Sequence, residues 1–175
     1  NANLQRYAEA FSFLQSKNLY TVDDLDNALH AMQDKIDTLK KSASSKQARI
    51  KEVDELLRMV DYYKSGKPAA DKLKSIRFEK SRQKYKSEHD NELRTFYMAE
   101  RKLKPYFKDG KLPITAWRKE RAQLEQEYRD IQTELSPLHA DAKKLWAIHY
   151  NIYEVQHEQE RQNTELRQKK QEIEH

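Results

Sequence analysis

One hydrophobic pattern constrains the fold of this chain more than any other. Between residues 25 and 60, apolar residues recur at alternating steps of four and three. The members are Leu25, Leu29, Met32, Ile36, Leu39, Ala43, Ile50, Val53, Leu57 and Val60, with Lys46 as a polar step. A ladder of about five heptads is typical of a helix that buries one narrow stripe against a long partner helix. The pattern predicts a helix over 22–64, about 65 Å long.

Two further stretches supply the partners that this helix needs. A second helix is predicted over 69–104, after a turn at Ser65–Pro68, where Gly and Pro are typical of a helix end. Its apolar stripe shifts phase after Ile76 and consists of Phe78, Tyr85, His89, Phe96, Ala99, Leu103 and Tyr106. A third helix is predicted to begin near Ala116, after a turn at 108–113. Its ladder continues to Ile152 through Pro137, where we expect a kink.

The start and end of the chain complete the predicted organisation. A short amphipathic helix over 4–16 precedes the long ladder, and Thr21 is the expected N-cap of the first long helix. Beyond Ile152 the ladder keeps its register but loses its apolar residues. We therefore predict an all-α fold, an elongated antiparallel three-helix coiled-coil bundle with a short N-terminal helix. Its expected parts are the N-terminal helix and cap at 1–20, the coiled coil at 21–153, and a charged helical extension at 154–175.

Composition excludes several classes of function. The chain has no Cys, so disulfides and thiolate metal sites are absent, and this is typical of a reducing compartment. No apolar run approaches the roughly 20 residues that cross a membrane. The six His form no metal-ligand spacing. We expect a cytoplasmic fragment of a longer protein, without membrane insertion, metal, cofactor or catalysis of its own.

Basic residues are concentrated in two segments. Residues 40–51 and 72–86 together hold twelve basic residues and one acidic residue, Glu79. The twelve candidates for nucleic-acid binding are Lys40, Lys41, Lys46, Arg49, Lys51, Lys72, Lys74, Arg77, Lys80, Arg82, Lys84 and Lys86. A hairpin about Gly66 would place Lys80 level with Val53, so that the two segments overlap as one basic band. Such a band predicts contact with a polyanion, most commonly the phosphates of DNA or RNA.

The alternative interpretation of these charges stays open. Lys-rich faces are also ordinary solvated surface on coiled coils, and Arg77 and Lys80 are placed to pair with Glu52 or Glu55. A second candidate surface is the aromatic series Trp146, Tyr150 and Tyr153 on the third helix. It is either an exposed docking stripe for another protein or a wider core face that the first short helix or a partner covers.

The order of segments resembles a known family. The segments are FLQSKNLYTVDDL at Phe13–Leu25, YYKSGK at Tyr62–Lys67, ELRTFYMAERKLKPYF at Glu92–Phe107 and LPITAWRKERAQL at Leu112–Leu124. They resemble the helical region after the catalytic domain of relaxase/mobilisation proteins from Gram-positive conjugative transposons and mobilisable elements. The resemblance implies a parent protein that nicks DNA at a transfer origin through a catalytic Tyr and a His-bound metal. None of those catalytic residues has a counterpart here.

The resemblance implies a non-catalytic domain of a conjugative-transfer relaxase. In this hypothesis it contacts the DNA backbone, coupling or secretion-channel proteins, or both. The alternative hypothesis is a coiled-coil spacer or a homodimerisation module without any nucleic-acid role, in which the C-terminal helix pairs with a second copy.

Overall fold

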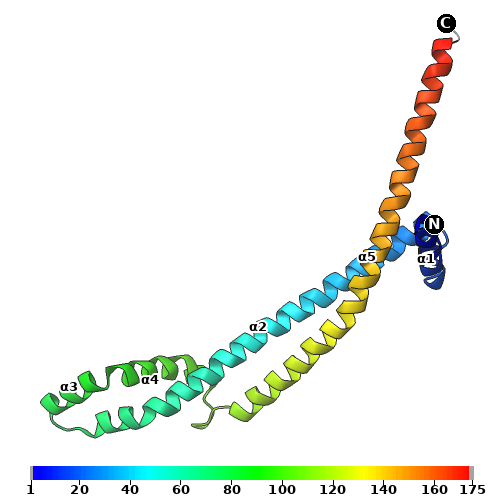
Figure 1. Cartoon of the computed structure of the whole chain (residues 1–175). Helices are drawn as coiled ribbons and strands as arrows, with labels where there is room; N and C mark the ends of the chain where they lie inside the picture. The colour runs from blue at the N-terminus through cyan, green and yellow to red at the C-terminus, as the bar shows by residue number, and fades with distance from the viewer. Residues whose placement is uncertain (1, 174–175) are drawn as a thin grey trace. The chain divides into compact units, whose positions relative to one another are not determined.

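The computed structural model describes residues 2–173 and consists of helices joined by short turns. The elements are α1 (Ala2–Ser16), α2 (Val22–Ser75), α3 (Glu79–Glu88), α4 (Asp90–Leu103), the 3-10 helix η1 (Lys104–Tyr106) and α5 (Ile114–Ile173) (Figure 1). No β-strand occurs among these residues, so the predicted all-α class is confirmed. By contact the chain divides into two units, residues 1–41 with 131–175 and residues 42–130, and α2 and α5 contribute to both.

The first unit contains α1, the start of α2 and most of α5. Thr21 caps α2 as predicted, because its hydroxyl accepts the Asp24 amide at 3.0 Å while the Asp24 carboxylate accepts the Thr21 amide at 3.1 Å. The core lies where Leu25 and Leu29 of α2 meet Leu145 of α5. Partly buried residues of α1 and of the turn after it also pack there, among them Phe13, Leu14 and Leu19.

Ion pairs show that α2 and α5 run antiparallel within this unit. Asp26 near the start of α2 lies 2.9 Å from His149, and Lys35 further along α2 lies 3.1 Å from Glu134. From residue 153 to residue 173, every residue of α5 is exposed. Residues 153–173 therefore bury no stripe, and their assignment as an extension beyond the coiled coil stays a prediction. The last two residues of the predicted extension lie outside that part of the chain.

The second unit has two cores along α2. In one, Val53, Leu56, Met59 and Val60 of α2 contact Ala99 and Leu103 of α4 and Trp117 of α5. In the other, Ala69 and Ala70 contact Leu93 and Phe96 of α4. Both α4 and α5 run antiparallel to α2, and they lie along successive stretches of it (Figure 1). One coiled coil of three helices is not confirmed, and the predicted division at residues 20 and 153 stays a prediction.

The predicted turn at Ser65–Pro68 is wrong, because α2 continues through it to Ser75. Gly66 has a different role. A Cβ at this position would lie 2.6 Å from the Cβ of Phe96 and 3.0 Å from the carbonyl oxygen of Glu92. The missing side chain therefore lets α4 approach α2 closely. Pro68 lies inside the helix, where Ala69 and Ala70 pack on α4 and hold the segment in place.

The true hairpin lies at residues 76–78, where the apolar stripe shifts phase. The predicted second long helix is two helices, α3 and α4, which are separated at His89. Phe78 was predicted on the buried stripe, but it precedes α3 in an extended conformation and its side chain is 79% exposed. The predicted turn at 108–113 is confirmed, with positive φ at Asp109 and Gly110, and Asn18 in the turn after α1 also has positive φ.

Candidate nucleic-acid interface

The first basic segment is partly neutralised by acids of α5. Lys46 donates to Glu127 at 2.5 Å, and Arg49 donates through Nε to Glu120 at 2.7 Å. Arg49 also donates to Glu52 on its own helix at 2.9 Å. These two basic residues join α2 to α5 and are poorly placed to bind a polyanion as well.

The pKa values agree with this structural role. Hydrogen bonds to Glu120 and then to Glu52 raise the pKa of Arg49 above its ordinary value. The same Arg49 bond lowers the pKa of the Glu120 carboxyl, and a hydrogen bond from Lys46 lowers that of Glu127. Arg49 and Glu120 thus stabilise each other's charged form, and Lys46 stabilises the carboxylate of Glu127. The remaining candidates of this segment, Lys40, Lys41 and Lys51, are exposed on α2.

The second basic segment surrounds the hairpin between α2 and α3. We call it the basic turn, and its members are Lys72, Lys74, Arg77, Lys80, Arg82, Lys84 and Lys86. Six of the seven are exposed, and Arg82 is partly buried. Lys72 and Lys74 lie in the last turn of α2, where cations favour the negative end of the helix dipole. Lys80 and Arg82 lie at the start of α3, where the dipole disfavours cations.

Two side chains of the basic turn hold the hairpin in shape. Arg82 donates through Nη2 to the carbonyl oxygen of Ile76 at 3.0 Å. Lys72 places its ammonium 5.5 Å from the ring centroid of Tyr85, which in turn lies 4.1 Å from the ring of His89. A cation over an aromatic face is a favourable contact. These contacts attach α3 to the end of α2, although α3 has no buried residue.

The other cations of the basic turn have little acidic compensation. Lys84 lies 3.9 Å from Glu88 and Arg82 lies 3.7 Å from Glu79, both long contacts between exposed groups. Among the described residues, Lys74, Arg77, Lys80 and Lys86 form no ion pair or hydrogen bond through their side chains. Glu52 and Glu55 are not their partners, because Glu52 pairs with Arg49 and Glu55 pairs with Arg58 and Lys102.

The structure does not bring the two basic segments together. With the hairpin at 76–78, Lys72 lies level with Tyr85, and Lys80 follows the turn directly. The predicted position of Lys80 beside Val53 is wrong, since Val53 packs among Ala99, Leu103 and Trp117. Within α2, Lys46 and Lys72 are about 40 Å apart along the helix axis. The basic turn is therefore separate from the first segment.

The three aromatic candidates for protein docking are exposed on α5. Trp146 is 50% exposed, Tyr150 62% and Tyr153 51%. Residues 2–173 leave these side chains exposed, so the interpretation of a core face covered by the first short helix is wrong, and cover by a partner stays a prediction. Trp146 contacts the ring of His149 at 5.6 Å, and Tyr153 contacts that of His157 at 4.2 Å.

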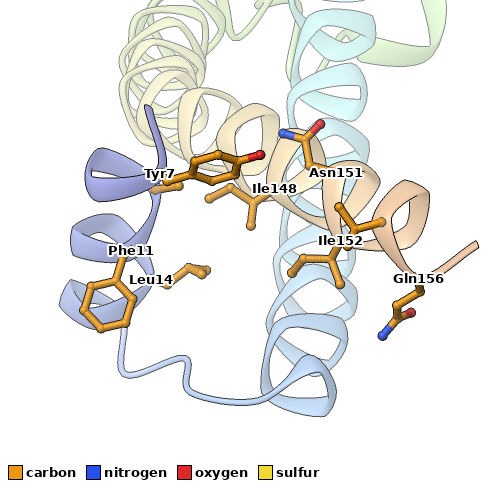
Figure 2. Close-up of a pocket in the computed structure, with 9 residues that line it drawn as sticks. Tyr7, Phe11, Leu14, Ile148, Asn151, Ile152 and Gln156 are labelled. Atoms are coloured by element: carbon orange, nitrogen blue, oxygen red, sulfur yellow. The ribbon is translucent and has the colours of Figure 1, made fainter. Parts of the chain in front are cut away.

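A neighbouring apolar groove was missed from the sequence. It lies between α1 and α5 in the first unit, with Tyr7, Phe11 and Leu14 on one side and Ile148 and Ile152 on the other (Figure 2). Tyr7 and Phe11 are both about two-thirds exposed, at 68% and 66%. The amphipathic pattern of residues 4–16 indicated an apolar face, but not that α5 leaves part of it uncovered.

Two other kinds of site, a metal centre and a membrane span, are absent from residues 2–173. Among residues 2–173, no three His, Cys, Asp or Glu side chains come together as metal ligands. In the same part of the chain, no helix combines the length and the apolar character that crossing a bilayer demands. No family model, curated protein or solved structure matches the chain.

Proposed function

We propose that this chain is a non-catalytic helical module that binds the phosphate backbone of nucleic acid, most directly DNA, through the basic turn. The observation that carries the proposal is a set of exposed cations that have no acidic partner within residues 2–173, namely Lys74, Arg77, Lys80 and Lys86. Phosphate contacts from such groups hold a protein on nucleic acid without reading its sequence.

The composition of α3 supports this proposal. The helix buries no residue, so its sequence contributes little to the core. Lys80 with Lys84, and Arg82 with Lys86, are four residues apart and place like charges on the same faces of the helix. Such pairs destabilise a helix by about 0.2–0.5 kcal/mol each. An anionic ligand would offset this repulsion.

The chain offers a matched control for the test. One variant replaces Lys74, Arg77 and Lys80 by Gln, and the control replaces Lys40, Lys41 and Lys51 by Gln. Each variant removes three exposed positive charges and so changes the net charge equally. Binding of a labelled 30-base-pair DNA duplex is measured by fluorescence anisotropy between 50 and 200 mM salt.

We expect the first variant to bind more weakly and with a flatter salt dependence than the control. Each lost phosphate contact reduces the slope of log K against log salt by about 0.9, so three reduce it by about 2.7. Equal losses in the two variants would show that binding depends on overall charge and not on the basic turn. Absence of binding by the parent chain at 50 mM salt, both to this duplex and to a single strand of the same length, would refute the proposal.

The wider context is also part of this proposal. The resemblance to the helical region of conjugative-transfer relaxases supports a cytoplasmic DNA-handling role beside a separate nicking domain. In that role, antiparallel coiled-coil pairing of α2 with α5 provides the scaffold that presents the basic turn. Coupling and secretion-channel proteins are the partners that this context adds.

A second function, self-association or protein docking, is favoured by exposed apolar residues of the first unit. Trp146, Tyr150 and Tyr153 are exposed, and Val155 and Leu166 of the exposed end of α5 are 53% and 61% exposed. In this alternative the full chain sediments as a dimer. We expect a chain truncated after Ile152 to sediment as a monomer, with its helicity per residue unchanged. Sedimentation of both chains as monomers would exclude the homodimer.

A further inference from the structure

We propose that the basic turn binds an unpaired nucleic-acid strand, with a base stacked on Phe78. This inference rests on the proposed function and specifies the form of nucleic acid that the site recognises. Phe78 lies between Arg77 and the first residue of α3, at the centre of the basic turn.

The exposure of Phe78 has no explanation in the packing of the chain. Its side chain is 79% exposed, and among residues 2–173 it is not a member of the three hydrophobic clusters described above. Single exposed apolar side chains are common on protein surfaces, so what distinguishes Phe78 is its position in a segment of exposed cations. Arg77 and Lys80, beside it in the sequence, have no acidic partner among the described residues.

The local backbone holds the ring in this position. Phe78 is extended, with φ −85° and ψ 124°, and its carbonyl oxygen accepts the amide of Arg82 at 2.9 Å as the first turn of α3 forms. The Arg82 side chain also donates a hydrogen bond to the carbonyl oxygen of Ile76, on the other side of Phe78 in the sequence. Two hydrogen bonds from one residue therefore fix the segment that carries the exposed ring.

An exposed ring that cations flank in the sequence fits a single strand better than a duplex. In a duplex both faces of every base are covered by its neighbours, and uncovering one costs a few kcal/mol. In a single strand the base faces are accessible. Stacking of a base on an aromatic side chain then adds binding affinity whatever the base sequence. The surrounding Lys and Arg side chains would then contact the phosphates on either side of the stacked base.

The test compares variants of Phe78 in the full chain. Phe78→Ala removes the ring, Phe78→Leu keeps apolar volume without an aromatic face, and Phe78→Trp keeps a face. Because the side chain is exposed, we expect all three to melt as the parent does by circular dichroism. Binding is measured for a 30-nucleotide oligo-dT, the same length of oligo-U, a 30-base-pair duplex, and vesicles of 30% anionic phospholipid.

We expect oligo-dT to bind more tightly than the duplex at equal salt, and Phe78→Ala and Phe78→Leu to weaken oligo-dT binding by about tenfold, within the range for one stacked base. Phe78→Trp should retain the affinity, and the duplex should be insensitive to all three changes. Equal loss with oligo-U also supports the inference, since RNA bases offer the same face.

Other outcomes overturn the inference in distinguishable ways. Equal binding of duplex and single strand with no effect of Phe78→Ala would reject base stacking and leave the phosphate site standing. Binding of neither nucleic acid would reject both proposals. Vesicle binding that is tighter than oligo-dT binding and is lost in Phe78→Ala would identify an anionic membrane surface as the ligand.

Discussion

Replacement of Gly66 by Ala tests the close approach of α2 and α4. In an isolated helix this change is stabilising by about 1 kcal/mol, because Gly has the greater conformational freedom when unfolded. Here the new Cβ would lie 2.6 Å from the Cβ of Phe96, against about 3.5–4.0 Å for a favourable carbon contact. The neighbours are a Cβ and backbone atoms, so no side-chain rotation removes the clash.

The cost follows from how far α4 must move. A displacement of about 1 Å would open the contacts of Phe96 and Leu93 with Ala70 and forfeit a quarter to a half of their dispersion energy. Overpacked sites of this kind cost about 1–3 kcal/mol. After the helix-propensity gain, we expect a net decrease of about 1 kcal/mol in the free energy of unfolding.

The assay is urea unfolding in a Trp146→Phe background. Trp117, which is buried in the second unit, then reports on that unit alone. Ser65→Ala is the matched control, because Ser65 is exposed beside Gly66 and should gain a few tenths of a kcal/mol from helix propensity. A rise in the midpoint for Gly66→Ala as large as that for the control would refute the close-approach argument.

Two further changes test the cap and the ion pairs. Thr21→Ala removes the acceptor for the Asp24 amide. We expect the free energy of unfolding of the first unit, measured by thermal unfolding, to fall by about 1 kcal/mol. An unchanged free energy of unfolding would contradict the cap. For Glu120, the bond from Arg49 lowers the folded pKa below its ordinary 4.5, so its stabilisation is present above about pH 4.5 and is lost as the pH falls through the folded pKa. Between pH 7 and pH 3, the free energy of unfolding measured by urea titration should therefore fall less for Glu120→Gln than for the parent. An equal fall would exclude a stabilising ion pair between Arg49 and Glu120.

The sequence predicted the helices better than it predicted where they turn. The four-three ladder of α2 and the cap at Thr21 depend on local spacing, and both are present in the structure. The segment Gly66–Pro68 has the composition of a turn, but its Gly meets a crossing helix and its Pro is held by packing on either side. Those are tertiary effects, and only the phase shift after Ile76 indicated the true hairpin locally.

The candidate interface depended on that hairpin and changed with it. Moving the turn from Gly66 to residues 76–78 separates the basic segments and places Lys46 and Arg49 opposite acids of α5. The sequence identified which residues are basic, but their partners were set by the register of α2 with α5. The exposure of Phe78 could not be predicted, because the apolar stripe was assigned on the assumption of one continuous helix over 69–104.

Lysine footprinting tests the central claim most directly, because it locates the ligand on the chain. The chain is acetylated briefly with and without saturating oligo-dT, and the modification rate of each Lys is read by peptide mass spectrometry. The exposed residues Lys74, Lys80 and Lys86 should be protected several-fold, while Lys40 and Lys41, which are also exposed, should react as in the free chain. Protection of Lys40 and Lys41 instead, or of no lysine at all, would contradict binding at the basic turn.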